Sequence, residues 1–343
     1  MQNKILNLFD EQFVAKLFRE KILKLYPDFA KIKKIKIIPH KNLVWEHTYH
    51  VVIEFEISFL TRSGKTVILP IFTTAHSSEP RKNVYDSLKF LWKSGFGKGY
   101  LTIPRPLFYS EYFKAVFYRG AQGKNLYQYI RQKNFKEIET IVPKAAQWLV
   151  KLHQTPVDKA RNFNRQNSRI KTVVPGIKHI FKKIEDNHPE YSQFYRAAFK
   201  IFIDKENEFF KKTKKLWLIH GDAHPENVIK MGKKKIAIID FTDLCLADFA
   251  RDIGSFSQQI EYMCNRKIGD QRYSEKIKKL FLSNYLKNAK IKLDGALKER
   301  IDNYYNWTAM RTATFFLLKA NPDPERAKPL IERVAKKLNI NNF

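Results

Sequence analysis

One short segment near the middle of the chain constrains its fold more than any other. Residues 217–219 are apolar and lead directly into the triplet His-Gly-Asp at 220–222, and Asn227 follows five residues after the aspartate. A second apolar run, residues 236–239, ends at Asp240. Short apolar runs bounded by glycine and polar residues are typical of strands. The segment therefore indicates that strands deliver two carboxylates and an amide.

A hairpin is predicted between Asn227 and Asp240. Residues 228–230 and 236–239 are apolar runs, and the turn 231–234 that joins them contains a glycine. Two apolar runs separated by a short glycine-containing connection are typical of a β-hairpin. Such a hairpin would fold Asp240 back beside Asn227.

The side chains of Asp222, Asn227 and Asp240 suit phosphoryl transfer. Mg²⁺ is a hard cation that takes oxygen ligands from carboxylates, amides and nucleotide phosphates. Asp222 can orient an acceptor hydroxyl and take its proton, while Asn227 and Asp240 hold metal ions that bridge the phosphates. The alternative is that the His-Gly-Asp triplet is a turn and Asp240 a strand-end cap. A turn, however, requires neither the asparagine nor the second aspartate at these spacings.

The triplet His-Gly-Asp at 220–222, then Asn227, then Ile-Asp-Phe at 239–241 resembles the catalytic motif of the aminoglycoside phosphotransferase and choline kinase superfamily. Members of this superfamily share the protein-kinase-like fold. The same order of Asp, Asn and a later Asp occurs in the signature of protein kinases. The resemblance extends over most of the chain, and it is strongest at residues 216–254.

The resemblance implies a role for each of five residues. Asp222 is the expected catalytic residue, and Asn227 and Asp240 are the expected ligands of one or two Mg²⁺ ions. His220 and Asp252 are expected to support them, Asp252 by accepting hydrogen bonds from the backbone of the catalytic loop. The implied phosphoryl donor is ATP, whose γ-phosphoryl group passes to a hydroxyl of a small molecule.

Length and composition indicate a globular chain. It has 343 residues, of which 44% are hydrophobic, enough for two domains or one two-lobed domain with a substantial core. No apolar run reaches the roughly 18 residues of a transmembrane helix, and the amino terminus lacks the apolar core of a signal peptide. Cys245 and Cys264 have neither metal-ligand spacing nor a disulfide framework, so we expect a cytoplasmic protein without membrane association.

The chain is strongly basic. Its formal net charge is +30, from 64 Lys and Arg against 34 Asp and Glu. Such an excess indicates a polyanionic partner, nucleic acid included, or an acidic substrate. The alternative is lysines scattered over the solvated surface, which the wide separation of the lysine runs 31–36, 211–215 and 233–235 favours.

The first third of the chain predicts a small lobe. Apolar residues at helical spacing indicate helices at 10–25 and 83–93, and apolar residues at strand spacing indicate three strands between them, at 35–38, 47–59 and 65–74. Three antiparallel strands followed by a helix match the small lobe of a kinase-like fold. The predicted class is therefore α+β, a bilobal protein-kinase-like fold with an antiparallel-sheet small lobe at 1–117 and a mainly helical large lobe at 118–343.

Residues 118–120 are the nucleotide-binding candidates. They comprise the last residue of a predicted strand at 113–118 and the first two residues of the connector 119–123, which contains glycine. In the superfamily the connector at this place joins the lobes and its backbone binds the adenine edge, so the resemblance implies that Tyr118, Arg119 and Gly120 contact ATP. The alternative is an ordinary loop.

The large lobe is predicted to be helical. Residues 126–131 are expected to begin this lobe, and residues 145–154 resemble the Leu-His helix that precedes the catalytic region in the superfamily. Helical spacing indicates further helices at 190–210, 256–263, 273–287, 297–320 and 324–338. Residues 155–215 are expected either to help form the acceptor site, as in the superfamily, or to pack as a helical hairpin. Nothing in them names a substrate.

One expected part of the small lobe is missing. Kinases carry a lysine on the third strand that pairs with nucleotide phosphates and with a helix carboxylate, and the third strand here has no interior lysine. His76 is one substitute for that cation, and Arg81 or Lys82 are others. Glu79 or Asp86 would be the carboxylate partner.

Two further features depart from the superfamily pattern. The loop 41–48, which would cover the phosphates, contains no glycine, and Pro70 in the third strand predicts an edge strand or a bulge. The missing lysine supports a rival function, a non-catalytic protein on the same fold with a basic surface for RNA or another polyanion. The intact Asp222, Asn227 and Asp240 favour catalysis. An aminoglycoside, a choline-like amine, a sugar or an amino alcohol all stay open as the acceptor, and the oligomeric state is unknown.

Overall fold

The structure is a computed structural model that describes residues 3–79, 81–158 and 160–340. The chain forms two compact units, and each is discontinuous in sequence. The first unit comprises Met1–Gly123 and Ile229–Thr242, and the second comprises Lys124–Val228 and Asp243–Phe343. The division predicted from the sequence, at residue 117, stays a prediction.

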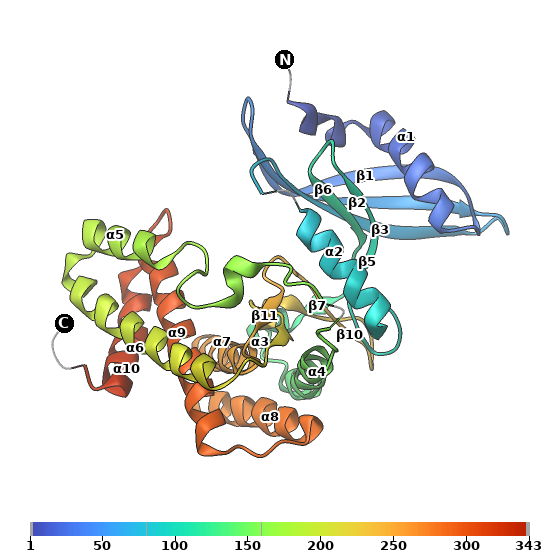
Figure 1. The fold of residues 1–343 in the computed structure, drawn as a ribbon. Coiled ribbons are helices and arrows are strands. Elements are labelled where there is room, and N and C mark those ends of the chain that lie inside the picture. Colours follow the sequence, from blue (N-terminus) through green and yellow to red (C-terminus); the bar gives the residue numbers. More distant parts are fainter. Residues whose placement is uncertain (1–2, 80, 159, 341–343) are drawn as a thin grey trace. The chain divides into compact units, whose positions relative to one another are not determined.

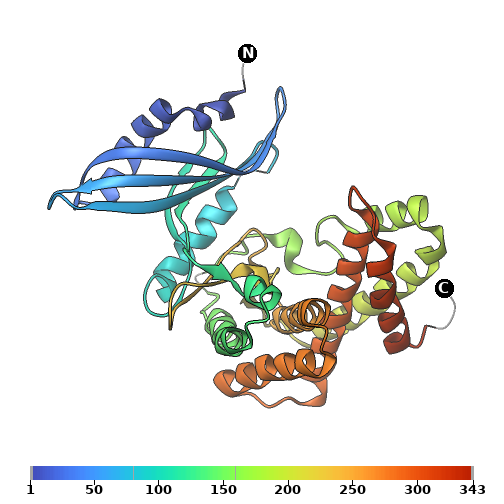
Figure 2. The same ribbon diagram turned by 180° about the vertical axis from the view of Figure 1, so that it is seen from behind.

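The first unit is built on a five-stranded antiparallel sheet with the strand order β1-β2-β3-β6-β5. Its strands are β1 (Phe29–Val44), β2 (Tyr49–Thr61), β3 (Thr66–His76), β5 (Arg105–Ser110) and β6 (Ala115–Arg119). Helices α1 (Glu11–Lys21) and α2 (Lys82–Leu91) lie on opposite sides of this sheet, as Figures 1 and 2 show. The three antiparallel strands followed by a helix are therefore confirmed. Short helical turns complete the unit at Lys4–Phe9, Leu23–Leu25 and Trp92–Phe96.

The core of the first unit lies between α1 and the sheet. Along β2 every second side chain is buried, as expected of a strand with one face on a core. The ring of Phe18 on α1 packs edge-on against Phe55 and Phe117, with centroid distances of 5.1 and 6.0 Å. The side chain of Asp10 caps α1 by accepting a hydrogen bond from the backbone N–H of Phe13 at 2.7 Å.

The prediction for Pro70 is wrong. Strand β3 is not an edge strand, because it lies between β2 and β6, and its pairing with β2 runs through Pro70 opposite Glu56 without a bulge. Proline is tolerated there because the ladder with β6 begins at the next residue, Ile71, opposite Arg119. Pro70 then contributes only its carbonyl, which accepts a hydrogen bond from Gly120 N at 3.0 Å.

The predicted hairpin is confirmed. Strands β9 (Val228–Lys230) and β10 (Ile236–Ile238) are neighbours in one sheet, and Met231 N donates to Lys235 O at 2.8 Å across the turn. On its other side β10 pairs in parallel with β4 (Leu101–Thr102). The hairpin therefore belongs to the packing of the first unit although it follows the His-Gly-Asp triplet in sequence.

The second unit is mainly helical. Its helices are α3 (Leu126–Arg131), α4 (Phe135–His153), α5 (Ile177–Asn187), α6 (Ser192–Lys212), α7 (Ala250–Ile268), α8 (Gln271–Ala289), α9 (Gly295–Leu318) and α10 (Pro324–Leu338). Short elements occur at β7 (Lys124–Asn125), β8 (Trp217–Ile219), β11 (Cys245–Ala247) and at the helical turns η4 (Arg165–Ser168), η5 (Pro189–Tyr191) and η6 (Pro225–Asn227).

Helix α7 is the centre of this unit, since most of its residues are buried and it packs against both α8 and α9. The ring of Phe256 on α7 stacks on Phe281 of α8 with a centroid distance of 4.4 Å. Helix α9 in turn lies beside α6 and α10 (Figures 1 and 2). Among the helices that the structure describes, none combines the length and apolar character needed to cross a bilayer.

Candidate active site

The loop that carries the His-Gly-Asp triplet follows strand β8, which pairs antiparallel with β11. Gly221 has a φ of +83°, and a Cβ atom built on it would lie 2.3 Å from the main-chain oxygen of Asp243. Both the left-handed backbone and the lack of space exclude a side chain. The glycine of the triplet is therefore required by the path of the chain.

Asp252 on α7 anchors this loop through hydrogen bonds to its backbone. Its carboxylate accepts hydrogen bonds from the backbone N–H groups of His220 at 2.7 Å and Gly221 at 2.9 Å, and it lies 3.0 Å from His153 Nε2. Burial alone would raise the pKa of Asp252, but the hydrogen bond and charge of His153 outweigh it and hold the pKa below its usual value. The backbone contacts expected of Asp252 are present. No chemical role was predicted for His153 from the sequence. Its Nδ1 lies 2.7 Å from the Tyr285 hydroxyl.

Arg251, the neighbour of Asp252, holds the same loop through its carbonyl groups. Its guanidinium donates to the main-chain oxygen of Gly221 at 3.0 Å and to that of Asn167. Asn167 Nδ2 donates in turn to the main-chain oxygen of Asp243 at 3.1 Å. The loop is therefore fixed through both its N–H and its carbonyl groups, which is how a rigid catalytic backbone is supported.

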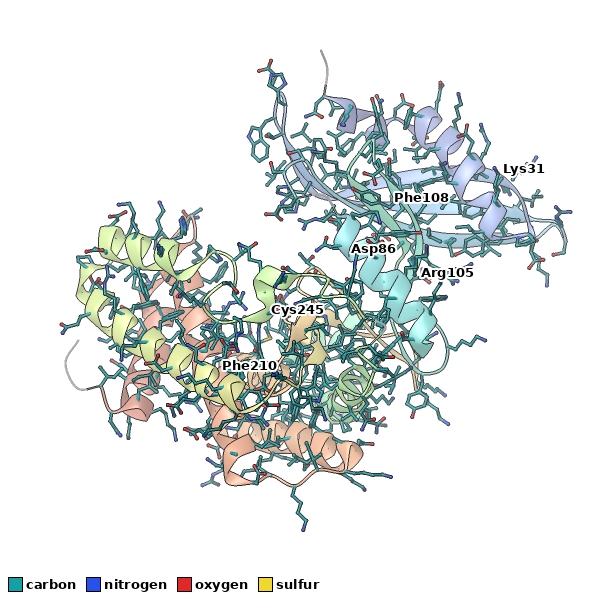
Figure 3. All side chains as sticks on the ribbon, in the orientation of Figure 1. Lys31, Asp86, Arg105, Phe108, Phe210 and Cys245 are labelled. Atoms are coloured by element: carbon teal, nitrogen blue, oxygen red, sulfur yellow. The ribbon has the colours of Figure 1, made fainter. Side chains whose placement is uncertain are left out.

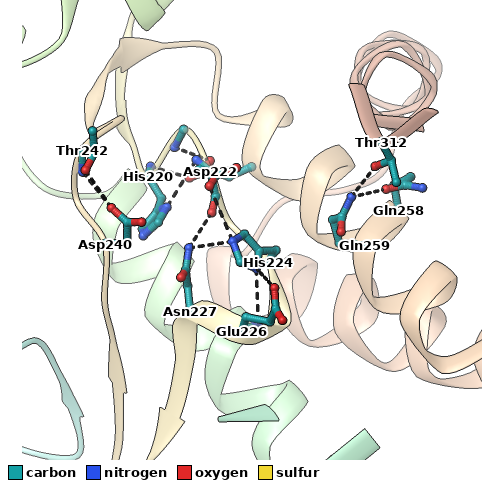
Figure 4. Close-up of polar contacts among 12 residues, drawn as sticks. His220, Asp222, His224, Glu226, Asn227, Asp240, Thr242, Gln258, Gln259 and Thr312 are labelled. Carbon is teal, nitrogen blue, oxygen red and sulfur yellow. Dashed lines mark hydrogen bonds and ion pairs between the residues drawn. The ribbon is translucent and has the colours of Figure 1, made fainter. Parts of the chain in front are cut away.

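Asp222 is the carboxylate that the loop presents. Its side chain is 42% exposed, its Oδ2 lies 3.5 Å from His224 Nε2, and its backbone N–H donates to His220 Nδ1 at 3.3 Å (Figure 4). Partial burial would raise the pKa of Asp222, but the hydrogen bond with His224 and the positive charge of Arg311 hold it well below its usual range. Asp222 is therefore ionised at neutral pH and accessible to a ligand.

Asn227 ends the turn η6 with its amide orientation fixed. Nδ2 donates to the main-chain oxygen of Asp222 at 3.0 Å and lies 3.0 Å from His224 Nε2 (Figure 4). Because the amide nitrogen donates to the main-chain oxygen of Asp222, the carbonyl oxygen Oδ1 is the atom turned away from that contact. An amide oxygen is a donor that Mg²⁺ accepts.

Asp240 follows β10 in the first unit and has a φ of +62°, uncommon for a residue other than glycine. Its Oδ1 accepts hydrogen bonds from the Thr242 hydroxyl at 2.8 Å and from the Thr242 N–H at 3.3 Å (Figure 4). Such side-chain bonds to the residue two positions on stabilise tight turns at aspartate. Together with burial, the larger cause, this carboxylate raises the pKa of Tyr118.

The three nucleotide-binding candidates lie at the end of β6. Tyr118 stacks on Phe72 of β3 with a centroid distance of 6.0 Å. Gly120 approaches the same ring so closely that a Cβ atom would lie 2.4 Å from it. The Gly120 N–H already donates to Pro70 O. The backbone carbonyl groups of this segment and the side chain of Arg119 therefore remain for contacts with a nucleotide base.

His76 lies at the end of β3 and is a neutral imidazole at pH 7. Its Nδ1 accepts hydrogen bonds from the backbone N–H groups of Ser78 at 3.2 Å and Glu79 at 3.0 Å. Burial is the largest cause that lowers the pKa of His76, and the charge of Arg81 acts in the same direction against that of Glu79. His76 can donate one hydrogen bond from Nε2, but it does not supply a permanent charge.

The other two substitutes for the missing lysine are paired with the carboxylates proposed for them. The guanidinium of Arg81 lies 3.4 Å from Glu79, and Arg81 is 8% exposed. The ammonium group of Lys82 lies 2.8 Å from Asp86 within the first turns of α2. Arg81 is therefore the more enclosed of the two permanent cations in this part of the first unit.

The model of the phosphotransferase enzyme family matches residues 52–273 of this chain. The chain belongs to this family. The matched stretch includes the whole loop described above and most of the first unit's sheet. Comparison with curated proteins gives no significant match.

Solved structures show the fold of this phosphotransferase family member. Spectinomycin phosphotransferase, in complex with ADP and spectinomycin, is 16% identical with a TM-score of 0.55, and the match covers 96% of this chain and 98% of that one. The ethanolamine kinase of Plasmodium vivax is 13% identical, with a TM-score of 0.53 and coverage of 88% and 81%. A choline/ethanolamine kinase family protein of Mesorhizobium loti is 15% identical, with a TM-score of 0.53 and coverage of 83% and 85%. The predicted kinase-like α+β fold is confirmed.

Four residues of this family member's loop and its surroundings were absent from the sequence prediction. His224 and Arg251 had a local signal, since each lies within two residues of a predicted site residue. Asn167 and Arg311 had none, because only the packing of η4 and α9 brings them to the loop.

Proposed function

We propose that this family member transfers the γ-phosphoryl group of ATP, in a Mg²⁺-dependent reaction, to a hydroxyl group of a small molecule. The observation that carries the proposal is the state of Asp222. It is ionised and partly exposed, on a backbone held on one side by Asp252 and on the other by Arg251. A fixed carboxylate of this kind is what an acceptor hydroxyl needs.

The proposed reaction is a direct displacement. The acceptor hydroxyl donates a hydrogen bond to Asp222, its oxygen forms a bond to the γ-phosphorus, and the bond from that phosphorus to the β–γ bridging oxygen breaks. The hydroxyl proton passes to Asp222. Because the pKa of Asp222 is low, its main contribution is to orient the hydroxyl, and the proton transfer comes late in a loose transition state.

We propose Asn227 and Asp240 as the residues that would hold Mg²⁺, because each has an oxygen donor of the kind that this ion takes. Asn227 offers Oδ1, since Nδ2 is bonded to the loop, and Asp240 offers a carboxylate whose Oδ1 also binds Thr242. Bound Mg²⁺ supplies neutralisation of phosphate charge. We propose Tyr118, Arg119 and Gly120 for the base of the nucleotide and His76 as a hydrogen-bond donor near the phosphates, with Arg81 as the permanent cation.

ATP as the donor is supported by structural relatives that were solved with ADP or ATP. The first test is thermal unfolding with and without ATP and Mg²⁺. A ligand at about 100 times its dissociation constant adds about 2.7 kcal/mol to the native state, which raises the melting temperature by several degrees. We expect such a Mg²⁺-dependent rise in the wild type.

Two variants make this test specific. Asp240→Asn keeps a residue that tolerates the positive φ but removes the charge, and the rise should be lost. Asp204→Asn, on an exposed aspartate of α6 paired with Lys200, is the control and should keep it. If the wild type shows no rise at millimolar nucleotide, the proposal fails and the non-catalytic polyanion-binding alternative gains, with a steep loss of RNA affinity on adding salt as its own signature.

Asp222→Asn separates binding from chemistry. We expect turnover, measured as ADP release with an acceptor, to fall by about 100-fold or more, while the nucleotide-dependent rise in melting temperature stays. Full activity in this variant would contradict the role of Asp222.

A further inference from the structure

A cavity of about 770 Å³ in the second unit is lined by basic side chains and by no acidic one among the described residues. Helices α5 and α9 and the segment after α9 form most of its wall. The basic side chains are His179, Lys183, His188, Arg311 and Lys319. The other lining side chains are uncharged. Titratable side chains that are all basic are unusual for a cavity that would hold an uncharged or cationic ligand, because like charges must then be desolvated together.

Arg311 connects this cavity to the catalytic loop. It lines the cavity, and its charge also acts on the carboxylates of Asp222 and Asp243. The Arg311 guanidinium lies 5.0 Å from the Trp307 ring centroid, yet it forms no hydrogen bond or ion pair with any residue that the structure describes. A guanidinium presents five N–H donors, stays charged at any physiological pH and suits carboxylate or phosphate oxygens. The donors of Arg311 are therefore unused by the fold beside the proposed catalytic residue.

Lys183 is a second cation of this cavity whose ammonium group has no carboxylate partner among the described residues. Two other basic side chains of this cavity have carboxylate neighbours, since the Lys319 ammonium group lies 3.6 Å from Asp323 and His188 Nδ1 lies 3.5 Å from Glu190. Lys183 and Arg311 thus face the same cavity from α5 and α9, and neither forms an ion pair with a carboxylate of the described residues.

We propose that the acceptor of this phosphotransferase carries an anionic oxygen group, a phosphate or a carboxylate, which Arg311 and Lys183 bind in this cavity while its hydroxyl meets Asp222. The proposal rests on the proposed function for the transfer step and adds the class of acceptor. It excludes the cationic aminoglycosides and choline-like amines that the sequence had left open, since these require carboxylates where this cavity has cations.

The positive lining continues beyond this cavity. A second cavity, of about 1180 Å³, shares His179 and has five more cations in its wall, again with no acidic side chain among its described residues. These cations are Arg165, Arg169, Lys171, Lys178 and Lys214. The guanidinium of Arg169 lies 3.8 Å from the ring centroid of Phe210. Figure 3 labels Phe210 on α6. An acceptor with more than one anionic group would therefore meet further cations along the same wall.

The test uses three probes with the same carbon skeleton. Glycerol 3-phosphate carries a phosphate, glycerate a carboxylate and glycerol neither, and kanamycin serves as a cationic probe. Binding of each to the full chain saturated with Mg-ADP is measured by titration calorimetry, so that the phosphate probe cannot occupy the nucleotide site. We expect at least one anionic probe to bind at least tenfold more tightly than glycerol and kanamycin, and the better of the two identifies the anionic group.

Two neighbouring lysines of α5 give a matched pair of variants. Lys183→Glu should weaken the anionic probe at least tenfold. Lys182→Glu makes the same charge change on the same helix, but Lys182 is exposed, paired with Asp186 at 3.3 Å and outside the cavity, so affinity should change less than twofold. The proposal is overturned if glycerol or kanamycin binds as well as the anionic probes, if neither anionic probe binds at 10 mM, or if the two variants behave alike.

Failure of the proposed function has a different signature. If Mg-ADP does not bind, the same titrations without nucleotide still decide whether the cavity takes an anion. If Mg-ADP binds and the anionic probes do not, the kinase assignment stands and only the acceptor class is wrong.

Discussion

Replacing Asp252 by asparagine is the most informative single change outside the reacting groups. The carboxylate is fully buried and accepts three hydrogen bonds, from His220 N, Gly221 N and His153 Nε2. Asparagine keeps one acceptor atom and adds an NH₂ group, which must then face at least one N–H donor. A buried donor left without an acceptor costs about 1–3 kcal/mol, and bonds to a charged acceptor contribute more than neutral ones. We expect Asp252→Asn to lower the free energy of unfolding by about 2–4 kcal/mol.

The assay is thermal unfolding followed by a probe of the helical unit. For a unit of roughly this size each kcal/mol shifts the melting temperature by about 2–4 °C, so a fall of about 4–16 °C is expected. Asp302→Asn is the control, since Asp302 is exposed and paired with Lys298 one turn away, and such pairs contribute little. A melting temperature for Asp252→Asn within 2 °C of the control would refute the reasoning.

The pH dependence provides an independent check. Because the folded protein holds the pKa of Asp252 below its usual value, the stabilisation is fully present above the unfolded pKa, about 3.9. It is lost as the pH falls through the folded value. The difference in stability between wild type and Asp252→Asn should therefore be constant from pH 5 to 8 and shrink below about pH 4. A difference that grows on acidification would contradict this sign.

Three further predictions follow from single residues. Gly221→Ala should lower the free energy of unfolding by about 2–4 kcal/mol and remove most of the activity, because Gly221 has a positive φ and no space for a side chain. Gly295→Ala is the control, since a Cβ atom there would meet nothing within 4 Å, and it should stay within about 1 kcal/mol of wild type in a denaturant titration. Arg311→Gln removes a positive charge that lowers the pKa of Asp222, so the acid limb of the kcat profile should move to higher pH; an unmoved limb would exclude that coupling. Burial raises the pKa of both cysteine thiols to about 12, so neither should react with a thiol reagent at pH 8 until the protein unfolds.

The sequence predicted elements with strong local signals well. The bounds of α10 agree residue for residue with the prediction, and α3 spans the residues that were expected to begin the large lobe. Helix α3 begins with a capping box between Asn125 and Gln128, and α10 begins at Pro324. In such helices the end is encoded by the side chains next to it.

Elements without such signals were predicted less well. Strand β1 runs through Phe29–Val44, whereas only four of its residues were expected, because it is an edge strand whose one fully buried side chain is Ile35. An edge strand rich in exposed lysine has no alternation to detect. Helix α4 begins ten residues before its predicted start, and Pro143 lies inside it, where a proline normally argues against a helix.

The candidate site shows the same division. The motif residues Asp222 and Asn227 and the loop-supporting Asp252 could be predicted because they lie at fixed spacings in sequence. Arg311 lies 89 residues beyond Asp222 on a helix with no motif. Its position depends on how α9 packs against α7, which no local pattern encodes.

The discontinuity of the first unit has a consequence for synthesis on the ribosome. The hairpin of β9 and β10 completes the first unit, where β10 pairs with β4 and Asn83 donates to the main-chain oxygen of Thr242 at 3.4 Å. That hairpin emerges only after the first stretch of the second unit has been made. The amino-terminal part must therefore wait, incompletely packed, while about a hundred further residues are translated, at about 5–20 residues per second. During that interval of roughly 5–20 seconds, the edge of β4 that later receives β10 is open to any other strand, so the nascent chain is most prone to mispairing there.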